Sequence, residues 1–242
     1  MGQLDARAEA TLATFVGDVE RVLGDALLSA VLYGSAAGPE WVAGRSDINV
    51  ALVVQRVTPR LLDALAPLVP AWRRRGGALP LLVDPEFLAH ARDAFPMELD
   101  DIARQHRRLA RADLFADLTV EPAAVRRQCE HEARSKLLRL HAAYLGAAGT
   151  PAALEELMLG SLKSFLVVLR HLLRLAGGEP AVGYADVLHA GERLLGPLPV
   201  MRRLLDHRSG ATTVARGTLR SEFAGYLAEV ERITARLDAL DA

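Results

Sequence analysis

The stretch that decides the fold is residues 32–54, which read LYGSAAGPEWVAGRSDINVALVV. One apolar run ends in Gly34 and Ser35, and a second apolar run begins after eleven more residues with Asp47 and Asn49 at its first and third positions. Side chains alternate between the two faces of a strand, so Asp47 and Asn49 are expected to point the same way. The pattern predicts two neighbouring strand ends that bring a glycine–serine turn and an acidic residue together.

These residue types suit the binding of a phosphate and a metal ion. Gly34 allows close approach of the backbone, and the amide and hydroxyl of Ser35 are donors that could hold a phosphate. Asp47 and Asn49 are placed where the ligands of a divalent metal ion would face that phosphate. The alternative interpretation of Asn49 is a polar residue on a solvent-facing side of the strand.

The motif resembles that of the DNA polymerase β-like nucleotidyltransferase superfamily, in particular its small bacterial members with a helical C-terminal domain, such as the kanamycin nucleotidyltransferases. The resemblance implies that carboxylates bind two Mg²⁺ ions, which clamp a nucleoside triphosphate, and that a nucleotidyl group passes to a hydroxyl of an acceptor. Under this resemblance Gly34 and Ser35 bind the nucleotide, while Asp47 is catalytic and a metal ligand.

The sequence departs from the family pattern at two of the three expected acids. Asn49 occupies the second metal-ligand position and brings an amide oxygen without a charge. Residues 78–83, the expected carrier of the third acid, read ALPLLV and contain none. Glu98 is the substitute, on a short strand predicted at 95–102 that would place Asp100 on the same face. Fewer charges weaken metal binding, so catalysis is expected to be impaired.

The chain contains 29 basic and 30 acidic residues, and two of the basic ones are the lysines Lys136 and Lys163. For Lys136, two interpretations are open: it binds the triphosphate, or it belongs to a solvated helix face supported by Glu132 four residues earlier. For Lys163 the solvated face is favoured.

Composition limits the possible partners and compartment. A formal net charge of −1 over 242 residues argues against nucleic-acid binding. The single cysteine, Cys129, excludes an intramolecular disulfide, and it falls on an apolar helical stripe that predicts a core position. No stretch is long enough for a membrane span and no signal peptide is evident, so we expect a cytoplasmic protein.

Periodicity and chain-breaking residues predict an α+β fold, in which a small mixed-sheet nucleotidyltransferase domain (1–118) precedes an all-helical bundle domain (119–242). Helices are predicted at 6–23, 58–75, 122–145, 150–175, 184–195 and 220–240, and strands at 26–33, 47–55, 78–83 and 95–102.

Three functions agree with this sequence. The first is transfer of a nucleotidyl group from a Mg²⁺–nucleoside triphosphate to a small-molecule or protein acceptor. The second is a pseudoenzyme that keeps the scaffold for nucleotide binding or protein interaction, an interpretation favoured by Asn49. The third is an antitoxin-like or assembly partner whose helical bundle forms a homodimer.

Overall fold

A computed structural model covers the chain and describes residues 4–44, 46–147, 150–178, 183–210 and 216–240. The chain divides into two compact units, Met1–Glu121 and Pro122–Ala242. The boundary expected from the sequence, after residue 118, lies three residues before this division. Among the described residues, no helix combines the length and hydropathy needed to cross a lipid bilayer.

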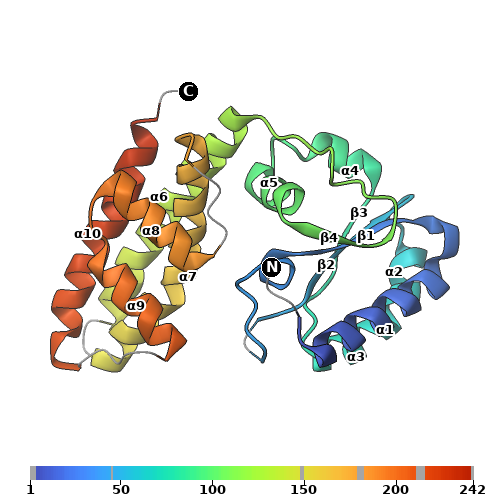
Figure 1. The fold of residues 1–242 in the computed structure, drawn as a ribbon, viewed down its shortest axis with the longest axis horizontal. Coiled ribbons are helices and arrows are strands. Elements are labelled where there is room, and N and C mark those ends of the chain that lie inside the picture. The colour runs from blue at the N-terminus through green and yellow to red at the C-terminus, as the bar shows by residue number, and fades with distance from the viewer. Residues whose placement is uncertain (1–3, 45, 148–149, 179–182, 211–215, 241–242) are drawn as a thin grey trace. The chain divides into compact units, whose positions relative to one another are not determined.

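The first unit is a four-stranded sheet with helices on both faces (Figure 1). In chain order its elements are α1 (Ala6–Leu23), η1 (Gly24–Ala26), β1 (Leu27–Tyr33), η2 (Gly34–Ala37), β2 (Asn49–Val54), α2 (Pro59–Leu65), η3 (Ala66–Leu68), α3 (Val69–Arg74), β3 (Leu81–Val83), α4 (Pro85–His90), α5 (Pro96–Arg104) and β4 (His106–Arg111).

The sheet is mixed, with the strand order β3-β2-β1-β4. Strand β1 pairs antiparallel with both β2 and β4, whereas β2 and β3 are parallel. Tyr33, the last residue of β1, lies opposite Asn49 on one side and opposite His106 on the other. The end of β1 and the beginnings of β2 and β4 therefore share one end of the sheet, which we call the Gly34 end.

Apolar side chains of β1 and β2 alternate between two cores, as the period of two in a strand requires. One face packs against α1, α2 and α3, and its buried residues include Leu32, Val50, Leu52, Leu65 and Trp72. The other packs against α4 and α5, and its buried residues include Val31, Ala51, Val53, Leu88 and Leu99. Both faces are covered, which explains why these strands read as continuous apolar runs.

The prediction of a strand at 95–102 is wrong, because α5 occupies this segment. Its buried residues are spaced for a helix, with Leu99 and Ile102 in the core beneath the sheet. The fourth strand is β4, which follows α5 directly. β4 reads HRRLAR and lies at an edge of the sheet. Because several of its polar residues are exposed, it lacks the apolar pattern from which a strand is predicted.

The helix predicted at 58–75 is broken into α2, η3 and α3. Thr58 caps α2, since its hydroxyl accepts a hydrogen bond from the amide of Leu61 at 3.2 Å. Pro67 and Pro70 lack the amide protons that a continuous helix would use, which accounts for the break.

The second unit is a helical bundle around α7. Its elements are α6 (Pro122–Ala147), α7 (Pro151–Leu175), α8 (Tyr184–Leu195), α9 (Pro199–Ser209), η4 (Arg216–Thr218) and α10 (Leu219–Asp238). α7 contacts α6, α8, α9 and α10, and its buried residues form a wide apolar face. Cys129 is buried, and burial raises the pKa of its thiol to about 12.

Helix α9 was not predicted from the sequence. A buried carboxylate accepts hydrogen bonds from the amides of its first turn. Glu229 of α10 is 3% exposed and accepts hydrogen bonds from the amides of Val200 and Met201, each at 2.8 Å. Burial raises the pKa of Glu229, although these two amides act in the opposite direction. The negative charge lies at the positive end of the helix dipole, where it stabilises α9.

The predicted fold class is confirmed. A small mixed sheet with its helices comes first in the chain, and an all-helical region follows.

Candidate functional site

Strand β1 ends in a tight turn at Gly34. The backbone changes from extended at Tyr33 to a φ of +71° at Gly34, a conformation that side chains with a Cβ rarely adopt. The short turn η2 that follows is closed by a hydrogen bond from the amide of Gly38 to the carbonyl oxygen of Ser35, at 3.1 Å. Ser35 is half-buried within this turn.

The turn lies directly against Asn49. A Cβ placed on Gly34 would be 3.2 Å from Nδ2 of Asn49, so a larger residue would press on the amide. The same Nδ2 donates a long hydrogen bond, 3.4 Å, to the carbonyl oxygen of Asp47. The structure thus brings Gly34, Asn49 and Asp47 together, although the turn and the second strand are separated by ten residues or more in the chain.

Asp47 lies just before β2, on a backbone fixed from both sides. The next residue, Ile48, donates to the carbonyl oxygen of Gly76 at 2.9 Å and accepts from the amide of Ala78 at 3.0 Å. On the other side, the hydroxyl of Ser46 accepts a hydrogen bond from the amide of Val42 at 3.1 Å. The Asp47 carboxylate is exposed at this anchored position.

The packing of Trp72 holds the segment that anchors Ile48. A Cβ on Gly77 would lie 1.9 Å from the indole of Trp72, so only glycine leaves room for the ring. The indole stacks on Phe15 with ring centroids 4.2 Å apart, and its Nε1 donates to the carbonyl oxygen of Ala78 at 2.5 Å. A buried aromatic pair thereby supports the strand end that carries Asp47.

Residues 47–50 alternate between more exposed and buried positions, as predicted for a strand. Ile48 and Val50 are buried in the core beneath α1, whereas Asp47 is exposed and Asn49 is half-buried. Asn49 is therefore on the side of β2 that also carries Ala51, which belongs to the core beneath α4 and α5.

The expected third acid is not on a strand. Glu98 is exposed on α5, and Asp100, two residues later, is buried and paired with Arg104 at 2.7 Å. Residues two apart on a helix point in nearly opposite directions, so the prediction that Glu98 and Asp100 share a face is wrong. Asp84, which follows β3, caps α4 by accepting from the amide of Phe87 at 2.9 Å, and the hydrogen bond lowers its pKa.

Strand β4 adds residues to the Gly34 end that the sequence analysis did not identify. Nδ1 of His106 lies 2.7 Å from the carbonyl oxygen of Ile102, and Nε2 lies 2.9 Å from the carboxylate of Asp113. The neighbouring side chain of Gln105 covers Gly38, where a Cβ would collide with its amide. Pairing with β1 places His106 opposite Tyr33, and the mostly polar sequence of β4 gives no local signal for this pairing.

Lys136 belongs to the second unit. It lies on α6, and its ammonium group pairs with Glu132 at 2.5 Å, as the i,i+4 spacing predicted. Nucleotide binding by Lys136 stays a prediction. Lys163 is exposed on α7.

The donor set at the Gly34 end suits one Mg²⁺ ion better than two. Mg²⁺ in proteins is commonly held by one or two carboxylates together with substrate phosphates and water. Asp47 provides an exposed carboxylate in a fixed position, and Asn49 offers a neutral amide. A site of two ions needs more negative charge than Asp47 supplies alone.

Comparison with known proteins gives a structural neighbour. No protein-family model and no curated protein sequence matches this chain. The crystal structure of spectinomycin adenyltransferase AAD(9) from Enterococcus faecialis, with ATP and spectinomycin, superposes with a TM-score of 0.60 at 12% sequence identity. The match covers 95% of this chain and 99% of the neighbour. The chain therefore has the fold of a nucleotidyltransferase.

Proposed function

We propose that the protein binds a nucleoside triphosphate at the Gly34 end and transfers its nucleotidyl group, at a reduced rate, to an acceptor hydroxyl. The observation that carries this proposal is the packing of Gly34 on Asn49, with Asp47 adjacent at an anchored strand end. The fold of the adenyltransferase supports it, and the contents of that crystal make ATP and spectinomycin the first substrates to test.

The proposed reaction is a displacement at phosphorus. The acceptor oxygen forms a bond to the α-phosphorus, the bond from that phosphorus to the bridging oxygen breaks, and pyrophosphate leaves with the bonding electrons. The acceptor hydroxyl loses its proton to a base. We assign this role to Glu98, the residue expected to replace the missing third acid of the site, and Glu98→Gln tests the assignment.

The residues at the Gly34 end have separate roles in this proposal. Gly34 and Ser35 let the backbone and a hydroxyl approach the phosphates, and Asp47, assisted by the oxygen of Asn49, holds Mg²⁺. Bound Mg²⁺ neutralises charge on the triphosphate. Because Asn49 adds no charge, we expect weaker metal binding and slower transfer than a site with two carboxylates would give.

A pseudoenzyme is the second candidate, and the amide at position 49 favours it. The same turn and the same aspartate would then bind a nucleotide without turnover, for sensing or for interaction with a protein partner. Measurements of binding and of transfer on the same samples separate the two candidates.

The first prediction concerns Asp47 and is tested by calorimetry with ATP and Mg²⁺. Asp47→Asn should weaken Mg²⁺-dependent ATP binding at least about tenfold, which equals ~1.4 kcal/mol. Asp63→Asn removes an exposed carboxylate from α2 and should leave the affinity unchanged. Equal ATP affinities for the wild type and Asp47→Asn would contradict the proposed site.

Asn49→Asp then distinguishes an impaired enzyme from a pseudoenzyme. Transfer of label from α-³²P-ATP to spectinomycin and to a panel of other small-molecule and protein acceptors is measured for both chains. A gain in transfer with the added carboxylate supports the impaired enzyme. ATP binding without transfer in both chains supports the pseudoenzyme.

A further inference from the structure

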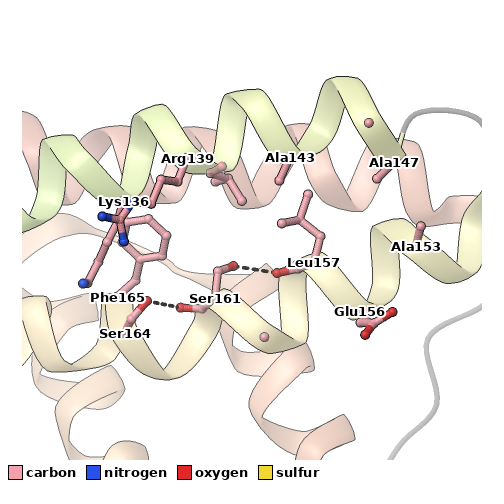
Figure 2. A pocket seen from close by; sticks show the side chains of 13 residues that line it. Lys136, Arg139, Ala143, Ala147, Ala153, Glu156, Leu157, Ser161, Ser164 and Phe165 are labelled. Carbon is pink, nitrogen blue, oxygen red and sulfur yellow. Dashed lines mark hydrogen bonds between the residues drawn. The ribbon is translucent and has the colours of Figure 1, made fainter.

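A groove of about 790 Å³ lies between α6 and α7, within the second unit. Figure 2 shows Lys136, Phe165 and Ser164 at one end of it, and Ala147 and Ala153 at the other. From Lys136 to Ala147 the groove extends about 16 Å, at 1.5 Å per helical residue. Pockets for small molecules typically have volumes of about 300–1,000 Å³, so this groove is large enough for one.

The groove is open because small residues face each other across the two helices. Gly160 of α7 and Ala143 and Gly146 of α6 line it. A Cβ added to Gly160 or to Gly146 would meet no atom within 4 Å. Larger side chains at these positions would therefore enter the groove rather than disturb the packing between the helices.

One end of the groove carries a net positive charge. Lys136 is already paired with Glu132, so the two charges largely cancel. Arg139, one turn further along α6, is exposed and has no ion-pair partner among the residues that the structure describes. Its guanidinium is available to an anion, and Ser164 lies at the same end.

The middle of the groove is apolar. Leu140, Leu157 and Phe165 provide its walls. The hydroxyl of Ser161 donates to the carbonyl oxygen of Leu157 at 2.8 Å and lies 2.9 Å from the hydroxyl of Tyr226. Because these partners already occupy the Ser161 hydroxyl, this section favours an apolar ligand surface.

We propose that the groove binds an elongated amphipathic monoanion, with its acidic head at Arg139 and its apolar body along Leu140 and Leu157. Glu156 lines the groove toward the opposite end and repels an anionic head there, which sets the orientation. A nucleoside triphosphate carries several negative charges, whereas this site offers one uncompensated cation. The proposed ligand of the groove therefore differs in charge from the nucleotide proposed for the Gly34 end.

Two fluorescent probes that differ in one charge test this proposal. 1-Anilinonaphthalene-8-sulfonate has an aromatic body and a sulfonate, and N-phenyl-1-naphthylamine has the same body without the anion. We expect the sulfonate probe to bind the full-length protein with one site per chain and more tightly than the neutral probe. Arg139→Gln should weaken binding of the sulfonate probe about tenfold and change binding of the neutral probe little.

Gly160→Leu fills the groove and should abolish binding of both probes. Thermal unfolding checks that this variant is folded, and a helical leucine in open space should not lower the melting temperature. Arg127→Gln removes an exposed charge of α6 outside the groove and serves as the matched control, with unchanged binding of both probes.

Three results would overturn the proposal. The first is unchanged binding of the sulfonate probe in Gly160→Leu, which would locate the probe elsewhere. The second is displacement of this probe by ATP, which would indicate that Lys136 and this groove bind the nucleotide. The third is a dimer in light scattering that Gly160→Leu converts to a monomer. This result would show that a second copy of the chain occupies the groove.

Discussion

Gly34 combines two requirements at one position, a left-handed backbone and contact with a neighbouring strand. Its φ of +71° permits the turn after β1, and its lack of a Cβ leaves room for the amide of Asn49. A sequence can suggest the first requirement, because glycine after an apolar run indicates a turn. The second depends on the register of β1 and β2, in which Tyr33 faces Asn49.

Gly34→Ala should lower the free energy of unfolding by about 1–2 kcal/mol, because an L-residue is strained in the left-handed region. It should also weaken ATP binding, since the methyl group presses on Asn49. Urea denaturation and calorimetry measure the two effects.

Gly17→Ala is the matched control. Gly17 lies inside α1, and a Cβ there would meet no atom within 4 Å, so this change should raise stability by about 0.5–1 kcal/mol. Equal stability changes in the two variants would show that Gly34 has no special backbone role.

At the scale of elements, the side chain of His106 connects β4 by polar contacts to the end of α5 and to the segment that follows β4. Its ring reaches the carbonyl oxygen of Ile102, at the end of α5, and the carboxylate of Asp113 beyond β4. Asp113 also accepts from the amides of Phe115 and Ala116 at 3.2 and 3.1 Å. Burial alone raises the pKa of Asp113, but the hydrogen bonds with His106 and these amides outweigh it and lower the pKa.

A lowered carboxyl pKa predicts a specific dependence on pH. The stabilisation by Asp113 should be complete above its ordinary pKa of 3.8 and should be lost as the pH falls through the lower value of the folded state. Asp113→Asn should therefore have a lower urea midpoint than the wild type at about pH 7, and the difference should shrink below about pH 3.8. A difference that grows in acid would contradict this assignment.

At the scale of the whole molecule, the two units carry different spectroscopic probes. Trp41 and Trp72 are both in the first unit. The longest helices, α6, α7 and α10, are in the second. Tryptophan fluorescence therefore reports on the first unit, and the far-ultraviolet circular dichroism signal is dominated by the second.

Glu229→Ala should destabilise the second unit by about 3 kcal/mol, because it leaves the buried amides of Val200 and Met201 without their charged acceptor. We expect the urea midpoint measured by circular dichroism to fall while the fluorescence midpoint stays. Glu231→Ala, an exposed residue of the same helix, should change neither midpoint. A parallel fall in both midpoints would mean that the two units unfold together.

The sequence by itself determined the elements that have a strong local period. The helix at 6–23 and the helix from 184 to 195 have the predicted limits, and the strands around residues 32–54 lie where the apolar runs indicate. Periodicity indicates which face of a helix or strand is buried. In these segments the pattern is complete within the segment itself, so the local sequence is enough to predict it. The order of elements then predicted the α+β class.

Tertiary structure alone decided the details around the Gly34 end. Residues Pro96–Arg104 form a helix whose Leu99 and Ile102 pack on the sheet, and HRRLAR forms a strand that pairs with β1. The contact of Gly34 with Asn49 likewise arises from the pairing of β1 with β2. Such pairings join residues far apart in the chain, and their energies depend on the neighbours that folding supplies, so no local pattern encodes them.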